Sequence, residues 1–249
     1  MGTTYVRLTA PGSFCEQGVV CISPHGSDIL RVFNLSDQGM ERLSSAITST
    51  WSRGIKSGAW QADKLYEFRF HGNPWPGAGA EAIQSRRLMV GIFRCMLGMG
   101  YGLALSPNVS KRQGAKDAWV FLQRFDSWRC SDPRDIFAIS FNRANRIRII
   151  DAKDEITALI THVAGRYWRK GTAKIGSYEG VPEIELAGSP WDANGKDSTA
   201  NRVLVAQLVA GLAGAGYTVY ASLASERGNG CRPDSWVVVK NPPTLTGNT

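Results

Sequence analysis

The stretch "HGNPW" at His71–Trp75 returns much later in the chain as "AGSPW" at Ala187–Trp191. In both places Gly-x-Pro-Trp follows a run that alternates apolar and polar residues, as a strand does, and precedes a helix-like run. Glycine adopts backbone angles that other residues avoid, and proline fixes φ and cannot continue a sheet ladder. We therefore predict that the motif ends a strand and turns the chain. Its tryptophan is expected to fold back over the core of its own copy, the alternative being an aromatic platform for a ligand.

The similarity extends far beyond this motif. Cys21–Asp37 aligns with Ala138–Asp154 at an offset of 117 residues, and from Glu67 and Glu183 the offset is 116. Chance does not keep so many Gly, Pro and Trp residues in order over about a hundred positions, so the chain is an internal duplication. The repeated positions expected to be structural are Gly72, Pro74, Trp75, Arg86, Asp117 and Trp119, matched by Gly188, Pro190, Trp191, Arg202, Asp234 and Trp236.

Two copies allow one secondary structure to be read twice. Alternating runs predict strands, amphipathic runs predict helices, and each copy reads ββαβαββ, an α+β module. We expect the first repeat at 17–124, a short linker at 125–135 and the second repeat at 136–240. The flanking segments 1–16 and 241–249 are expected to be flexible tails, and the two repeats to pack with pseudo-twofold symmetry.

The recurring arginines suggest a structural role. Arg86 and Arg202 stand in the first half of an apolar helix, and Asp117 and Asp234 precede the last strand of each copy. We hypothesise that each arginine pairs with an acid inside its own copy, which would fix the helix against the sheet. The rival interpretation is an anion site at these arginines.

Composition limits the class of protein. The 249 residues carry a formal charge of +8, which permits a nucleic acid, an anionic membrane surface or an acidic protein as partner but requires none. Five cysteines at irregular spacing predict reduced thiols and a cytoplasmic or nuclear location. The uncharged stretch from Val203 to Ala224 is long enough for a membrane span, but its glycines and β-type end predict a buried helix, a stop and a strand.

Reactive residues are not kept between the copies. His25 faces Asn142, His71 faces Ala187 and Cys21 faces Ala138. No metal-ligand spacing, phosphate loop or nucleophile elbow is present, so no catalytic residue, metal or cofactor is predicted. An enzyme with one degenerate site at Cys21, His25 or His71 stays open as an alternative.

Since the positions kept twice are structural types, we expect a non-enzymatic scaffold that binds a macromolecule, with protein as the first choice of partner. The alternative is a nucleic-acid or anionic-lipid binder that uses basic loops of the first repeat beside exposed aromatic residues. The candidate binding residues for that alternative are Trp60, Trp75, Lys56, Lys64, Lys111, Arg112 and Lys116. The oligomeric state is not indicated by the sequence.

Overall fold

The computed structural model describes residues 18–77, 79–107, 116–123, 132–224 and 233–241. The predicted tails lie almost wholly outside these ranges, as do Lys111, Arg112 and most of the predicted linker. The first copy consists of β1 (Val19–His25), β2 (Ile29–Phe33), α1 (Asp37–Thr50), β3 (Ile55–Ala62), β4 (Leu65–Phe70), α2 (Ala80–Gly98), β5 (Tyr101–Leu105) and β6 (Trp119–Gln123). The second consists of β7 (Ile136–Asn142), β8 (Arg146–Ile150), α3 (Asp154–Tyr167), β9 (Thr172–Tyr178), β10 (Val181–Leu186), α4 (Lys196–Gly214), β11 (Tyr217–Ala224) and β12 (Pro233–Lys240), with short 3-10 turns at Pro133–Asp135 and Pro190–Asp192.

The strand order confirms the duplication. The first sheet runs β3-β4-β2-β1-β6-β5, and the second runs β9-β10-β8-β7-β12-β11 when read in the same direction. Every neighbouring pair is antiparallel in both sheets. The chain is therefore an α+β protein built from two copies of one module.

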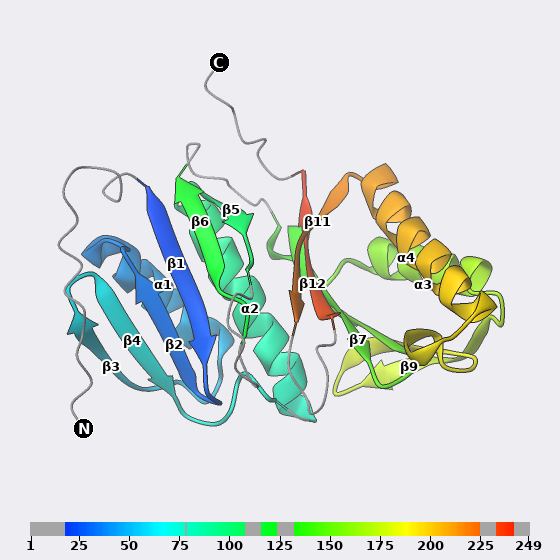
Figure 1. Ribbon diagram of the computed structural model, residues 1–249, viewed down its shortest axis with the longest axis horizontal. Helices are drawn as coiled ribbons and strands as arrows, with labels where there is room; N and C mark the ends of the chain where they lie inside the picture. The colour runs from blue at the N-terminus through cyan, green and yellow to red at the C-terminus, as the bar shows by residue number, and fades with distance from the viewer. Residues whose placement is uncertain (1–17, 78, 108–115, 124–131, 225–232, 242–249) are drawn as a thin grey trace, which may run out of the picture.

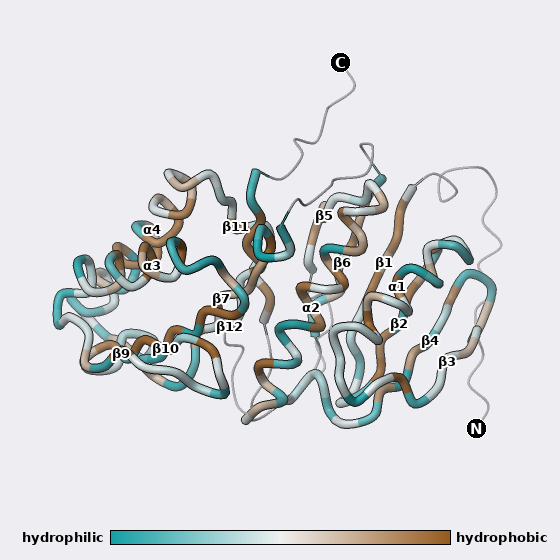
Figure 2. Tube along the Cα trace, turned by 180° about the vertical axis from the view of Figure 1, so that it is seen from behind, coloured by the Kyte–Doolittle hydropathy of each residue, from teal (hydrophilic) through white to brown (hydrophobic). Residues whose placement is uncertain are grey.

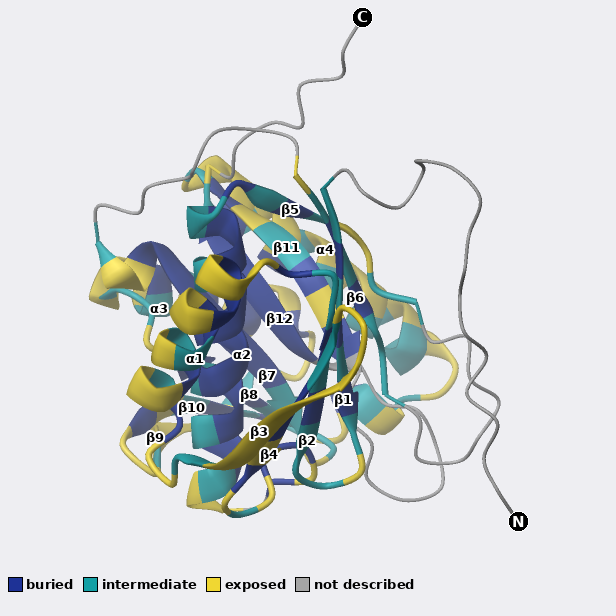
Figure 3. Ribbon diagram, turned by 90° about the vertical axis from the view of Figure 1, so that its left-hand side faces the viewer, coloured by how far each residue is buried: buried dark blue, intermediate teal, exposed yellow. Residues whose placement is uncertain are grey.

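Each module has one strand more than the sequence predicted, so that it reads ββαββαββ. The added strands are β3 and β9, which form hairpins with β4 and β10 at the edge of each sheet. Most side chains of β3 and β9 are exposed on both faces, as the yellow β3 in Figure 3 shows. An edge strand without a buried face carries no apolar–polar alternation, which is the signal that the prediction used.

The Gly-x-Pro-Trp motif ties the end of the fourth strand to the first hairpin of each copy. Gly72 and Gly188 both have φ of 78°, in the left-handed region that favours glycine. The indole Nε1 of Trp75 donates to the carbonyl oxygen of Ile29 (2.7 Å), and that of Trp191 to the carbonyl oxygen of Arg146 (3.3 Å). These bonds close the same turn in both halves of the chain.

The copies pack head to tail. Sheet and helices alternate in four layers: the first sheet, α1 with α2, the second sheet, and α3 with α4 (Figure 1). Helix α2 contacts β5 of its own sheet and β7, β8 and β12 of the second sheet, whereas the main contacts of α4 are with α3, β11 and the turn at Pro190–Asp192. The expected pseudo-twofold relation does not describe this arrangement, because a twofold axis would also place α4 against the first sheet.

Helix α2 has consequently become a core helix with two apolar sides. Phe93 is fully buried and contacts Trp119 and Phe121 of the first sheet and Tyr220 of the second. Hydrophobic segments gather where β7 and β12 approach it (Figure 2). At the rim, Arg87 forms a bidentate ion pair with Asp151, with a closest approach of 2.8 Å.

The recurring arginines do not play the equivalent roles that we expected. Arg86 is buried, and its Nε donates to Ser235 Oγ of the other copy (3.0 Å), whereas Arg202 is exposed. Asp117 has an interaction of its own, and the side chain of Asp234 lies outside the described part of the chain. The arginine–acid pairs that do recur inside each copy join two strands: Arg31 with Glu67, and Arg148 with Glu183.

Candidate protein interface

Among the described candidate basic residues, Lys56, Lys64 and Lys116 do not lie together. Trp60 is 49% exposed, but Trp75 is buried at 5% in edge contact with Phe70 and leaves the candidate surface. Lys64 lies at the β3–β4 turn beside Asn34, and Lys116 donates to the carbonyl oxygen of Gly26 (2.8 Å) in the β1–β2 turn. These two turns stand at opposite ends of β2. Lys56 lies on the exposed edge strand β3.

Trp60 stands instead in an acidic groove between α1 and the edge strand β3. The ring of Trp60 meets Tyr66 edge to face at 5.1 Å between centroids. The adjoining cavity of about 730 Å³ includes the carboxylates of Asp37 and Glu41 together with hydroxyl groups of α1. Trp60 also lines a cavity of about 750 Å³ with Asp37, Asp63 and Lys64. Carboxylates outnumber amines around this ring, which disfavours phosphate.

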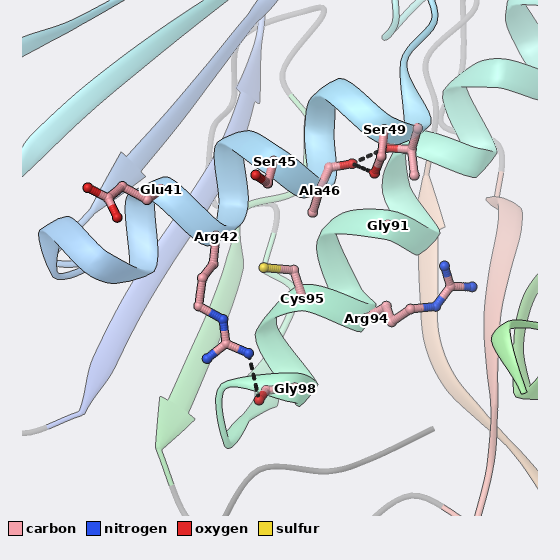
Figure 4. Close-up of a pocket in the computed structure, with 10 residues that line it drawn as sticks. Glu41, Arg42, Ser45, Ala46, Ser49, Gly91, Arg94, Cys95 and Gly98 are labelled. Atoms are coloured by element: carbon pink, nitrogen blue, oxygen red, sulfur yellow. Dashed lines mark hydrogen bonds between the residues drawn. The ribbon is translucent and has the colours of Figure 1, made fainter. Parts of the chain in front are cut away.

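A second groove, of about 520 Å³, lies between α1 and α2 (Figure 4). Arg42 donates to the carbonyl oxygen of Gly98 (3.1 Å). Arg94 points away from α1 and donates to the carbonyl oxygen of Pro133 (2.6 Å). Burial raises the pKa of the Cys95 thiol to about 11, which keeps it protonated at neutral pH. The groove therefore presents no reactive thiolate, and the Arg94 guanidinium is directed into the second copy.

The candidate reactive residues of β1 do not form a catalytic pair. Cys21 and His25 are four residues apart on one strand, so their Cα atoms are about 13 Å apart and beyond hydrogen-bonding reach. Burial raises the pKa of the Cys21 thiol, which disfavours the nucleophilic thiolate. His71 lies in the exposed turn after β4, where its carbonyl oxygen accepts a bond from Trp51 Nε1 (2.9 Å). The described residues contain no group of three possible metal ligands among His, Cys, Asp and Glu.

His25 has a structural counterpart in the second copy. Its Nε2 hydrogen-bonds Ser23 Oγ at 2.9 Å, and Asn142 Nδ2 donates to Ser140 Oγ at 2.8 Å at the equivalent place. Burial lowers the pKa of His25, the charge of Arg31 lowers it further, and Glu67 opposes both effects. An asparagine makes the same bond, so this contact does not depend on the acid–base chemistry of histidine.

What distinguishes the first copy is the side of its sheet on which no described helix lies, which we call the open face. Its apolar residues alternate with core residues along β1, β2, β4 and β6, and all are partly exposed. They include Val19, Cys21, Phe33, Leu65, Val120 and Leu122. No described helix covers this side: α1 and α2 lie on the opposite face (Figure 1).

The equivalent side of the second sheet is buried under α2. There the matching residues are at most 2% exposed: Ile136, Ala138, Ile150, Val181, Val237 and Val239. A surface that packs apolar side chains against a helix in one copy thus has apolar side chains and no described helix in the other.

The polar end of the open face is built around Glu67. This carboxylate is 6% exposed and pairs with Arg31 and Arg69, each at 2.9 Å. In the second copy Glu183 pairs with Arg148 (2.6 Å) and Arg146 (3.2 Å), and the guanidinium of Arg148 stacks over Tyr178 at 3.5 Å. In sequence the strands of this face resemble ordinary half-buried strands, and only the apolar residues on their outer side indicate a binding surface.

One domain-family model matches the chain twice, over residues 18–122 and 135–239. The chain belongs to that family. Each match spans one six-stranded sheet with its two helices, so the family domain is the module described above. Among solved structures, the chain is similar to a conserved kinetoplastid-specific protein from Trypanosoma cruzi, with 14% identity over 43% of this chain and 98% of that chain and a TM-score of 0.32. No curated protein gives a significant match.

None of the described helices is both long enough and apolar enough to cross a bilayer.

Proposed function

We propose that this protein is a non-enzymatic tandem-repeat binding protein whose open face receives a helical layer of a protein partner. One observation carries the proposal: the same face of the same module is already covered by a helix inside the chain, where α2 lies on the second sheet. A partly exposed apolar sheet face is the kind of surface that protein interfaces cover.

The partner chemistry follows from the internal contact. A helix that docks on such a sheet needs apolar side chains along one side, as α2 provides with Val90, Phe93 and Leu97. The polar end is formed by Arg31, Glu67 and Arg69, whose side chains can hydrogen-bond a polar group of the partner. The free thiols Cys21 and Cys95 support a cytoplasmic or nuclear location.

Site-specific photo-crosslinking in the native cell tests the proposal. A photoreactive side chain at Leu122, on the open face, is expected to give discrete protein adducts. The matched control is Ile175, which is 62% exposed on β9, at the outer edge of the second sheet. Protein adducts at Leu122 alone support the proposal. Adducts at neither position, or adducts only with nucleic acid or lipid, overturn it.

A further inference from the structure

The outer side of α4 is an exposed, uncharged helix surface apart from one arginine. Its residues are Arg202, Val203, Ala206, Val209, Ala210 and Ala213. Val203 and Val209 are 46% and 41% exposed, and the alanines between them leave the helix backbone open to close approach. The apolar residues that α4 buries are Leu204, Leu208 and Leu212, on its other side. An exposed helix in water normally carries charged residues on such a surface.

The equivalent side of α2 is an interface within the chain. At positions 116 residues earlier stand Arg86, Arg87, Val90, Phe93, Arg94 and Leu97. Four of these six are buried at 6% or less: Arg86, Val90, Phe93 and Leu97. They meet the buried face of the second sheet, which is the counterpart of the open face.

The two outer surfaces of the molecule therefore correspond to the two sides of its internal interface. The first sheet has the face that binds a helical layer, and α4 has the helical surface that binds such a face. Because the copies are arranged head to tail, both surfaces stand at opposite ends of the four layers, and one molecule cannot join them to each other (Figure 1). When two unlike surfaces of neighbouring molecules bind each other, one surface of each kind stays free, so a further molecule can bind in the same way.

We propose that the outer side of α4 of one molecule docks on the open face of a second copy of this chain, in the geometry by which α2 docks on the second sheet. The inference rests on the proposed function and names the partner as the chain itself. Such heterologous contacts generate open chains or rings of molecules, depending on whether the rotation between them closes.

The charges at the rim contribute less to this docking than to the internal interface. The internal ion pair Arg87–Asp151 is replaced at the equivalent positions by Val203 and Asn34, so no like charges face each other there. Arg202 of α4 and the Arg31–Glu67–Arg69 group of the sheet are both net positive. Added salt screens their repulsion and is expected to leave the self-association unchanged or stronger.

Sedimentation over about a hundredfold range of concentration tests the docking. The full chain of 27.2 kDa is expected to gain mass with concentration. Ala206→Glu on α4 and Val120→Glu on the open face should each abolish the long assemblies, because each places a charge in an apolar contact. Ile175→Glu, on the exposed edge strand β9, is the matched control and should leave association as it is. Circular dichroism and the melting temperature show that each variant is folded.

Mixing the two blocked variants decides between head-to-tail and twofold association. Ala206→Glu keeps an intact open face, and Val120→Glu keeps an intact α4. Equal amounts of the two should therefore form a dimer of twice the chain mass and nothing larger. A wild-type chain that stays monomeric, an Ala206→Glu variant that still assembles, or a mixture that stays monomeric would each overturn the proposal.

The crosslinks at Leu122 separate this inference from the function on which it rests. Adducts between two copies of this chain support both proposals. Adducts with a different protein alone leave the binding function standing and overturn self-docking. An intramolecular crosslink to residues 1–17 means that the chain covers its own face and overturns both.

Discussion

The two copies differ less in their residues than in what lies against them. Arg31–Glu67 and Arg148–Glu183 are the same cross-strand ion pair, yet the arginine side chain is 43% exposed in the first copy and 7% in the second. The second arginine lies under the ring of Tyr178, at 3.5 Å, where the first copy has Ala62, and α2 of the neighbouring copy lies on the same sheet. Equivalent residues are thus buried to different extents according to the position of their module in the four layers. The same substitution can therefore change the free energy of unfolding by different amounts in the two copies.

The largest difference between the copies is expected for equivalent substitutions in α2 and α4. Phe93→Ala is expected to reduce the free energy of unfolding by about 3–5 kcal/mol, because Phe93 is fully buried between the two sheets. Val209→Ala, at the equivalent place in α4, should change it by less than about 0.5 kcal/mol in dilute solution. Urea unfolding measures both. Equal losses would mean that the two helices are equally buried, contrary to the head-to-tail arrangement.

The ion pairs should give the next largest difference. Arg148→Ala leaves Glu183 in a covered site, with Arg146 as its remaining cation, and is expected to cost about 3 kcal/mol. Arg31→Ala removes a half-exposed cation and leaves buried Glu67 paired with Arg69, so it should cost less, about 2 kcal/mol. The same urea titration distinguishes them, and a cost for Arg31 as large as that for Arg148 would indicate that the open face is covered in solution.

A smaller effect is expected at the hydrogen bond between the copies. Ser235→Ala removes the hydroxyl that accepts from buried Arg86 and should cost about 1 kcal/mol. The matched change is Ala118→Ser in the first copy, at the equivalent position, where we expect no gain in dilute solution. A stabilising Ala118→Ser would show that an arginine already approaches the open face.

The smallest expected effect is a pH dependence confined to the first copy. The folded-state pKa of His25 lies below its ordinary value, so the unfolded chain binds the proton more readily. The contribution of His25 to stability is therefore complete above the ordinary histidine pKa and decreases as the pH falls below about 6.5. His25→Asn, which installs the residue of the second copy, should remove this part of the pH dependence. Melting temperatures between neutral and mildly acidic pH measure the difference, and an unchanged profile in the variant would contradict the assignment.

The elements with strong local signals were predictable from the sequence. The motif ending in Trp75 and Trp191 located two equivalent turns. Short β-type runs located β1 and β7, and alternation located β2 and β4 with their counterparts. The strands β3 and β9 were missed because they are exposed on both sides and depend on pairing with β4 and β10 instead of on a buried face.

The way in which the two copies pack against each other could not be predicted from the sequence. Arg86 and Arg202 look alike in sequence, but one is buried against Ser235 and the other is exposed. A trace of this asymmetry was available: α2 carries Phe93 and Leu97 where α4 carries Val209 and Ala213. Larger apolar residues on one helix indicate a second buried side, although they do not say which surface covers it.

Because α2 packs against both sheets, neither copy is expected to be stable when it is separated from the other. A first copy released from its neighbour would bring Phe93 and Leu97 to the surface, and a second copy alone would expose the whole of its α2-facing sheet. Because the two copies are covalently connected, each has a high effective concentration near the other, which keeps these apolar surfaces covered. A gene rearrangement that separated them would be expected to yield two aggregating fragments instead of two small soluble domains.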